Sequence, residues 1–214
     1  MREHAPDHAR VVPRHLAVIP DGNRRYARKH ALSYADGYMA GARMALQVVY
    51  WCLDAGIEHL SGFGSSVDNL TQRPPEDGRT IRDAVDWFCR EARAVPGVSL
   101  AVFGEPEGSA GLVTGADPTT DGPASGRLVV HVARWYSGRH DVAAVAAAVP
   151  HCGAETVVRS SRSTGGQRRL SGFLPLQTAY AELYFLDTLW ADLTADEVRG
   201  ALRWFAAQER RFGE

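Results

Sequence analysis

The feature of this sequence that most constrains its fold is a repeated alternation of strand and helix patterns along one chain. The clearest strand pattern is the apolar run HLAVIP at residues 15–20, and the clearest helix pattern covers residues 34–56 and ends at a glycine. Further strands are expected at 57–64, 98–104, 127–134 and 154–160, and further helices at 79–95, 141–149 and 194–212. Such alternation predicts a single α/β domain with a mainly parallel central sheet and helices on both faces.

Length, charge and cysteine content narrow the class of protein. The chain has 214 residues and a formal net charge of -1, so binding to nucleic acid through bulk charge is not expected. Its three cysteines show no CxxC spacing, which favours reduced thiols and a cytoplasmic location. No apolar run reaches the roughly 18 residues of a transmembrane span. We expect a flexible segment at residues 1–14 and one catalytic domain at residues 15–214.

The first strand pattern ends in a turn with the chemistry of an anion site. Asp21-Gly22-Asn23 follows the strand, and Arg25 and Arg28 follow the turn at the start of a helix. Ligands of parallel sheets bind beyond the carboxyl ends of the strands, and a helix N-terminus offers N–H groups to a phosphate. A carboxylate beside a phosphate needs a cation between them, which points to Mg²⁺. Alternatively, Asp21 is a helix N-cap and the arginines form a solvated helix face.

A second cationic cluster follows the strand pattern at 154–160. Four arginines surround a Gly-Gly pair and several hydroxyl side chains, at positions Arg159, Arg162, Arg168 and Arg169. Guanidinium groups in such density suit a pyrophosphate. Glu182 lies farther on, in the apolar run TAYAELYFLDTLW. A carboxylate in that setting is either a costly buried charge or a ligand.

Together these motifs resemble those of the cis-prenyltransferases, the undecaprenyl diphosphate synthase family, over nearly the whole chain. The matching stretches occur in the family's order and read PDGNRRYA, SSVDNLTQRP, RWYSGRHD, RSTGGQRRLSGF, QTAYAELYF and RRFG. The resemblance implies the fold of an undecaprenyl diphosphate synthase and the transfer of prenyl groups between isoprenyl diphosphates. It also implies a Mg²⁺ cofactor and a homodimer.

The resemblance assigns roles to residues of this chain. Asp21 is expected to hold Mg²⁺ on the allylic diphosphate, and Glu182 to complete the metal site from the same or the other subunit. Other residues are expected to bind the allylic diphosphate or lie beside its leaving oxygen, namely Gly22, Asn23, Arg25, Ser66, Asn69 and Arg73. The acceptor diphosphate is assigned to Arg169, Ser171 and either Arg159 or Arg162.

The chain's end is expected to act across the dimer. By the resemblance, Arg211 and Gly213 reach the phosphates bound to the neighbouring subunit. The terminal helix pattern, with an N-cap at Thr194 or Asp196, carries apolar residues at helical spacing that can bury against a partner, namely Leu202, Phe205 and Ala206.

Several departures from the family pattern bear on the substrate. Tyr34 and Tyr38 stand where long-chain members carry an arginine and a histidine, and they either line the pocket or pack on a helix face. Arg24, where the family often has glycine, is expected to replace one of the lost cations. The helix pattern after Arg73 is short, and residues 104–126 read as a surface loop rich in glycine and proline. Because each helical turn adds about 5.4 Å, we expect a shallow tunnel and a product of one to three isoprene units.

The sequence therefore predicts a prenyltransferase that joins a short allylic diphosphate, most simply dimethylallyl diphosphate, to isopentenyl diphosphate or to a second dimethylallyl diphosphate. The second coupling is of the irregular type made by lavandulyl and cyclolavandulyl diphosphate synthases. One alternative is prenyl transfer to an aromatic acceptor, although the retained Arg169, Ser171 and Arg211 argue against it. The other alternative is a non-catalytic partner subunit, against which Asp21 argues.

Overall fold

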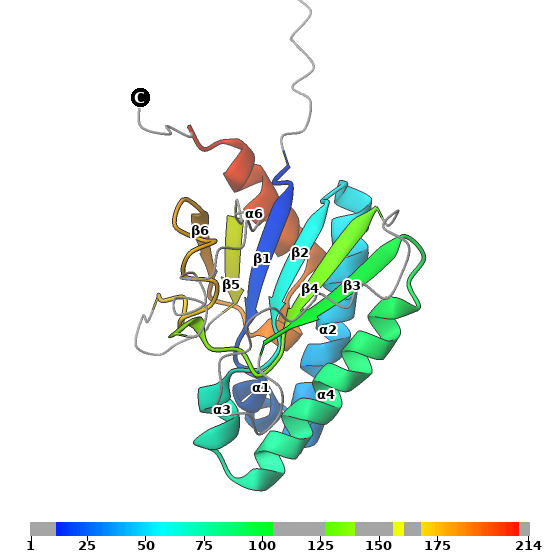
Figure 1. The fold of residues 1–214 in the computed structure, drawn as a ribbon, viewed down its shortest axis with the longest axis vertical. Coiled ribbons are helices and arrows are strands. Elements are labelled where there is room, and N and C mark those ends of the chain that lie inside the picture. The colour runs from blue at the N-terminus through cyan, green and yellow to red at the C-terminus, as the bar shows by residue number, and fades with distance from the viewer. Residues whose placement is uncertain (1–11, 105–126, 140–155, 161–167, 210–214) are drawn as a thin grey trace, which may run out of the picture.

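Six strands form one sheet in the computed structural model, which describes residues 12–104, 127–139, 156–160 and 168–209. The sheet order is β3-β4-β2-β1-β5-β6, and every neighbouring pair is parallel (Figure 1). The strands are β1 (His15–Pro20), β2 (His59–Phe63), β3 (Val98–Phe103), β4 (Leu128–Ala133), β5 (Thr156–Ser160) and β6 (Glu182–Leu186). The first five confirm the strand patterns, whereas β6 was not expected.

The helices of the described residues pack mainly on one face of this sheet. They are α1 (Asn23–Lys29), α2 (Tyr34–Ala55), α3 (Val67–Thr71), α4 (Pro75–Arg93) and α6 (Ala195–Ala206), with a 3-10 turn η2 (Trp190–Asp192). Residues of α2, α4 and α6 share one core cluster with the sheet. The other face carries Ala17 and Ile19, which pack against Phe173 and Leu174. The helix expected at 141–149 lies outside the described residues.

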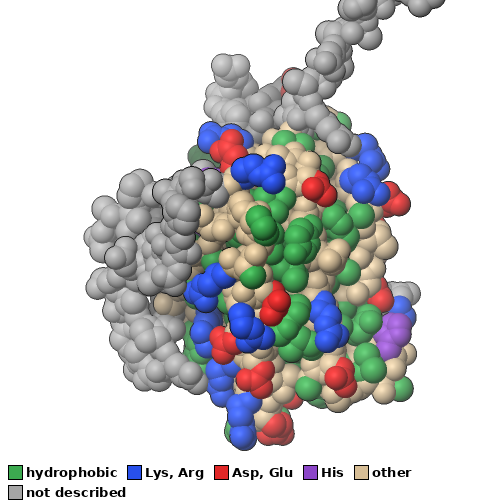
Figure 2. All heavy atoms as spheres, turned by 90° about the vertical axis from the view of Figure 1, so that its right-hand side faces the viewer, with side chains coloured by type: hydrophobic (Ala, Val, Ile, Leu, Met, Phe, Trp, Pro, Cys, Tyr) green, Lys and Arg blue, Asp and Glu red, His purple; other side chains and the backbone are tan. Residues whose placement is uncertain are grey.

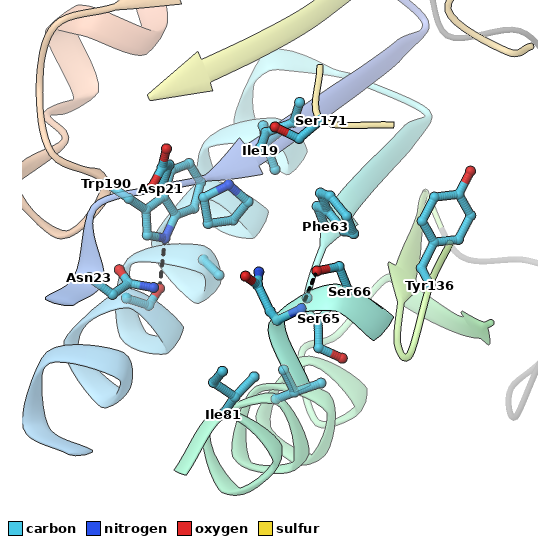
Figure 3. A pocket seen from close by; sticks show the side chains of 18 of the residues that line it. Ile19, Asp21, Asn23, Phe63, Ser65, Ser66, Ile81, Tyr136, Ser171 and Trp190 are labelled. Atoms are coloured by element: carbon cyan, nitrogen blue, oxygen red, sulfur yellow. Dashed lines mark hydrogen bonds between the residues drawn. The ribbon is translucent and has the colours of Figure 1, made fainter. Parts of the chain in front are cut away.

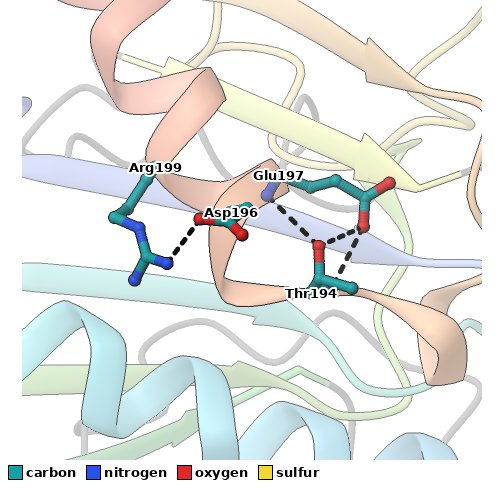
Figure 4. Close-up of polar contacts among 4 residues, drawn as sticks. All are labelled: Thr194, Asp196, Glu197 and Arg199. Carbon is teal, nitrogen blue, oxygen red and sulfur yellow. Dashed lines mark hydrogen bonds and ion pairs between the residues drawn. The ribbon is translucent and has the colours of Figure 1, made fainter.

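Helix ends follow local sequence signals. The Ser33 hydroxyl accepts the Asp36 N–H at 3.1 Å to begin α2, and Gly56 ends it with a φ of 78°. The expected N-cap Thr194 begins α6 in a capping box with Glu197, beside an ion pair between Asp196 and Arg199 (Figure 4). These caps fix where α2 begins and ends and where α6 begins.

Two helix predictions were wrong in length. The helix after Arg73 is not short: Pro75 takes its first position, where proline is well tolerated, so α4 has 19 residues. The terminal helix α6 ends at Ala206 rather than at residue 212. Phe205 is 1% exposed and packs inside its own chain, so it is not available to a partner as we expected.

The surface carries charges of both signs. On the side that bears β3 and α4, Lys and Arg side chains alternate with Asp and Glu around small apolar areas (Figure 2). That face therefore offers no basic stripe for a nucleic acid backbone. Within the ranges that the structure describes, none of the helices has the length and apolar character needed to span a bilayer.

Candidate active site

A cavity of about 960 Å³ opens at the carboxyl ends of β1, β2 and β4 (Figure 3). This is the edge where ligands of parallel sheets bind. Most of the predicted site residues line it, although they come from segments far apart in the sequence. They are Asp21, Gly22, Asn23, Arg24, Arg25, Tyr38, Ser66, Asn69, Arg73, Arg169 and Ser171.

The turn after β1 is held in place from both sides. Gly22 has a φ of 99°, and a Cβ there would lie 2.8 Å from a Leu189 methyl group, so this turn requires glycine. The Asp21 carbonyl accepts the Trp190 N–H at 3.1 Å. The Asp21 carboxylate, which is partly exposed, lies 3.3 Å from an Arg25 guanidinium nitrogen. The turn therefore presents a carboxylate and a cation to the cavity together.

The Asn23 side chain fits into a notch in α2. A Cβ on Gly41 would lie 2.8 Å from the Asn23 amide carbon, and the Gly41 carbonyl accepts the Trp190 indole N–H at 2.8 Å. The Asn23 side-chain oxygen is buried and has no hydrogen-bond partner among the described residues. A buried acceptor of this kind is commonly satisfied by water, an ion or a ligand.

The Asp21 carboxylate fits a magnesium ion held jointly by protein and substrate. Mg²⁺ prefers oxygen ligands and is usually bound by one or two carboxylates plus substrate phosphates. Asp21 supplies a carboxylate at the cavity wall, whereas the Asn23 amide oxygen is buried against Gly41 of α2. In the described part of the chain, no three His, Cys, Asp or Glu side chains converge into a metal site of their own.

The residues after β2 form a second wall. Ser66 caps α3, because its hydroxyl accepts the Asn69 N–H at 3.1 Å (Figure 3). Arg73 follows α3 and donates a hydrogen bond to the Tyr38 hydroxyl on α2. Burial raises the pKa of Tyr38, so the phenol stays protonated and neutral while Arg73 keeps its charge. Tyr38 therefore orients Arg73 at the mouth.

Arg24 is oriented in a similar way. Its guanidinium lies 4.6 Å from the centre of the Tyr34 ring and 3.8 Å from an Asp77 carboxylate oxygen. A hydrogen bond to Tyr34 is the main cause that raises the pKa of Arg24. Arg24 lines the cavity, whereas Tyr34 does not, so Tyr34 acts on the site only through Arg24.

A third wall comes from the segment after residue 167. Arg169 and Ser171 line the cavity, where Ser171 lies near Ile19 of β1 (Figure 3), and Ser171 has a φ of 53°. Two further cations line it: Arg28 on α1, which the sequence placed beside the anion-binding turn, and Arg139 after β4, which had no assigned site role. Arg139 lies in the RWYSGRHD motif, which reads as structural in the sequence alone.

An apolar pouch continues inward from this polar mouth. It lies between the sheet and two helices, with Ala42, Ala45 and Val48 on α2 and Ile81, Ala84, Val85 and Phe88 on α4. Both helices run from the carboxyl edge of the sheet back to its amino edge. The lining on α2 extends from Tyr38 to Val48, a span of ten residues or about 15 Å.

Some predicted residues do not join this site in the described chain. Glu182 pairs through Thr156 with Leu16 in the sheet register, which places it at the amino end of the strands. Along the strand direction, the five steps from Leu16 to Asp21 separate the level of Glu182 from Asp21 by about 16 Å. The Arg159 backbone lies beside Ile19, which lines the cavity, but the Arg159 side chain is outside what the structure describes. The positions 162, 211 and 213 are outside the described residues.

Comparison with known proteins identifies the family. The family described as "Putative undecaprenyl diphosphate synthase" matches residues 19–163 and 156–213. An isoprenyl transferase of Aquifex aeolicus is 30% identical, over 94% of this chain and 96% of its own. A ditrans,polycis-undecaprenyl-diphosphate synthase of Pseudomonas syringae pv. tomato is 34% identical, over 95% and 91%.

The fold has a counterpart among solved structures. Lavandulyl diphosphate synthase from Lavandula x intermedia, solved in complex with dimethylallyl diphosphate, superposes with a TM-score of 0.76 over 95% of this chain and 99% of that one. At 19% identity this similarity concerns the fold alone. The family match and the curated relatives carry the assignment further: the chain is a transferase and belongs to the cis-prenyltransferase family of the undecaprenyl diphosphate synthases.

Proposed function

We propose that this prenyltransferase makes a short product, joining dimethylallyl diphosphate to isopentenyl diphosphate or to a second dimethylallyl diphosphate. The observation that carries the proposal is the depth of the pouch. Its lining on α2 spans about 15 Å, and one isoprene unit is about as long as one helical turn of 5.4 Å. About three units fill that length, whereas the helix itself continues to Ala55 without lining the cavity.

The residues at the mouth fit the ionisation of an allylic diphosphate. The donor's C–O bond breaks, pyrophosphate leaves, the acceptor double bond forms the new C–C bond, and the acceptor loses a proton. Arg25, Arg24 and Arg73 would stabilise the negative charge that develops on the departing pyrophosphate, and Asn69 would donate to it. The apolar pouch would hold the hydrocarbon and exclude water from the carbocation.

The second substrate would lie across the cavity mouth. Arg169 and Ser171 face it from the segment after residue 167, which supports their role as ligands of the acceptor diphosphate. A neutral aromatic acceptor would need no such guanidinium and hydroxyl ligands. The acceptor is therefore a second isoprenyl diphosphate in our proposal.

Magnesium would be held by Asp21 together with substrate phosphates, where it would neutralise charge on the leaving pyrophosphate. Within one chain Glu182 is too far from Asp21 to share the ion, so a role for it in the metal site requires a second subunit.

A homodimer is part of the proposal. Among the described residues β6 is an edge strand, and apolar side chains near it are exposed, namely Leu176, Tyr180 and Leu183. We also propose a cytoplasmic location, because Cys52 and Cys89 are free thiols.

The test is a product assay with labelled dimethylallyl diphosphate and Mg²⁺, first alone and then with isopentenyl diphosphate. We expect products of two or three isoprene units, and the first reaction distinguishes irregular from regular coupling. A ladder extending to long polyprenyl chains would contradict the shallow pouch, and no product under either condition would contradict the donor assignment.

A further inference from the structure

Tyr136 follows β4 and contacts one wall of the cavity through its backbone. Its N–H donates to the Ser65 carbonyl at 3.0 Å, and its carbonyl accepts the Val67 N–H at 3.1 Å. These bonds form an isolated parallel bridge between Tyr136 and Ser66. The bridge fixes the start of α3, where Ser66 caps the helix that carries Asn69.

The side chain of the same residue contacts the opposite wall. The Tyr136 hydroxyl accepts the Leu174 N–H at 3.1 Å in a buried hydrogen bond. Its ring packs edge-on against Phe63, Phe103 and Phe173, with centroid separations of 5.7, 5.6 and 6.0 Å. Phe173 is fully buried, so this contact anchors the segment that carries Arg169 and Ser171.

That anchored segment has a backbone that needs support. Ser171, Gly172 and Leu174 all have positive φ, at 53°, 75° and 47°. Residues other than glycine lose about 1–2 kcal/mol in this conformation, and they persist in it only where surrounding contacts determine it. The hydrogen bond to the Tyr136 hydroxyl is made at Leu174, the last of these residues.

A second contact between the segment after β4 and the segment that carries Arg169 and Ser171 is made at Gly138, two residues after Tyr136. A Cβ on Gly138 would overlap the Gly172 carbonyl oxygen and lie 3.2 Å from a Pro175 ring carbon. The backbones therefore touch directly at Gly138, and a glycine is required there because there is no space for a side chain.

We propose that Tyr136, supported by Gly138, is a positioning residue that fixes the acceptor-binding segment relative to α3. This inference rests on the proposed function, because it assigns Arg169 and Ser171 to the acceptor diphosphate. The phenol hydroxyl acts through Leu174 on the geometry of those two ligands. Loss of this hydroxyl weakens binding of the acceptor diphosphate and leaves binding of the donor diphosphate at the turn after β1 nearly unchanged.

The test compares Tyr136→Phe with Phe103→Leu. The first variant keeps the ring and removes the hydroxyl that accepts the Leu174 N–H, whereas the second disturbs the same aromatic cluster at a residue that does not itself line the cavity. Binding of isopentenyl diphosphate and of dimethylallyl diphosphate is measured by calorimetry, together with thermal unfolding. We expect about tenfold weaker binding of isopentenyl diphosphate in Tyr136→Phe, which corresponds to about 1.4 kcal/mol, and less than twofold change for the dimethylallyl diphosphate bound at the turn after β1.

A second pair of variants tests the backbone contact. Gly138→Ala should show the same selective loss, and Gly200→Ala is its control, because a Cβ on Gly200 has open space except for an Arg203 side-chain nitrogen at 3.9 Å. Equal losses for both diphosphates, no loss in Tyr136→Phe, or the same loss in Phe103→Leu would overturn the positioning role. If the wild-type protein binds both diphosphates and the variants show the selective loss, but the wild type forms no product, only the proposed coupling is refuted. A protein that binds neither would refute both.

Discussion

Truncation of Phe88 is expected to lengthen the product by about one isoprene unit. Phe88 is the last residue of α4 to line the pouch, seven residues or about 10 Å beyond Ile81. Its ring contains about as many carbons as an isoprene unit, so Phe88→Ala opens roughly one unit of depth at the far end. Ala45→Leu, on the facing helix α2, should shorten the product for the opposite reason.

The stability cost of the change can be separated from its effect on the product. Phe88 is 9% exposed, and truncating a buried phenylalanine to alanine costs about 3–5 kcal/mol. Because domains are stable by only about 5–15 kcal/mol, urea unfolding must show that the variant is folded under assay conditions. Phe88→Leu, which keeps more of the packing, provides a milder variant with a smaller expected shift in chain length.

The assay measures chain lengths by chromatography and mass spectrometry after reaction of dimethylallyl diphosphate with excess isopentenyl diphosphate. The matched control is Trp87→Leu, since Trp87 packs against the same core on the same helix but does not line the cavity. An unchanged product distribution in a folded, active Phe88→Ala protein would refute the depth argument. Equal lengthening in Trp87→Leu would show that loosened packing, rather than pouch depth, controls the product.

Three further predictions concern the mouth and the chain's end. Asp21→Asn should lower turnover by orders of magnitude and change the free energy of unfolding by about 1 kcal/mol or less, because its ion pair with Arg25 is partly exposed; near-normal turnover would exclude the metal role. Arg169→Ala should weaken isopentenyl diphosphate binding far more than dimethylallyl diphosphate binding in the same calorimetric titration, and equal losses would mean that the two sites are misassigned. Deleting residues 211–214 should abolish turnover in a protein that circular dichroism shows to be folded. Mixing this truncated chain with Asp21→Asn chains should restore part of the activity, and no recovery after proven subunit exchange would place the tail's action within its own chain.

Strands with strong local signals were predictable, and β6 shows why one was not. The run HLAVIP is a continuous apolar strand with a turn behind it, and the structure begins and ends β1 at the same residues. In contrast, β6 begins with Glu182 and lies inside a longer apolar run without a clear period. Its strand conformation comes from pairing with β5, a contact that no local pattern encodes.

The division between α1 and α2 could be predicted only in part, for a similar reason. The sequence indicates a helix after the Asp21 turn and a long one from Tyr34, but it does not show how the two are separated. The structure ends α1 at Lys29, gives Ala31 a φ of 53°, and begins α2 after Ser33. Alanine is a poor signal for a left-handed residue, so this break depends on the packing of α1 against α2.

Many of the site residues predicted within recognisable motifs line the cavity, but the residues that orient them were not predicted. Trp190 binds the Asp21 carbonyl through its backbone and Gly41 through its indole, across separations of more than a hundred residues. Tyr136 connects two walls in the same way. Such residues have no local pattern, because their contribution is a contact between segments that only the folded sheet brings together.

Tyr34 and Tyr38 stand where the resemblance to long-chain prenyltransferases implies an arginine and a histidine. Tyr34 and Tyr38 cannot carry positive charge, yet each contacts an arginine from another element: Arg24 from α1 and Arg73 from the end of α3. A phenol is neutral near neutral pH, and burial raises the pKa of Tyr38 further, so its side chain does not cancel the charge of Arg73. These contacts therefore hold guanidinium groups at the mouth, which supports the proposed binding of two small diphosphates at the opening of a shallow pouch.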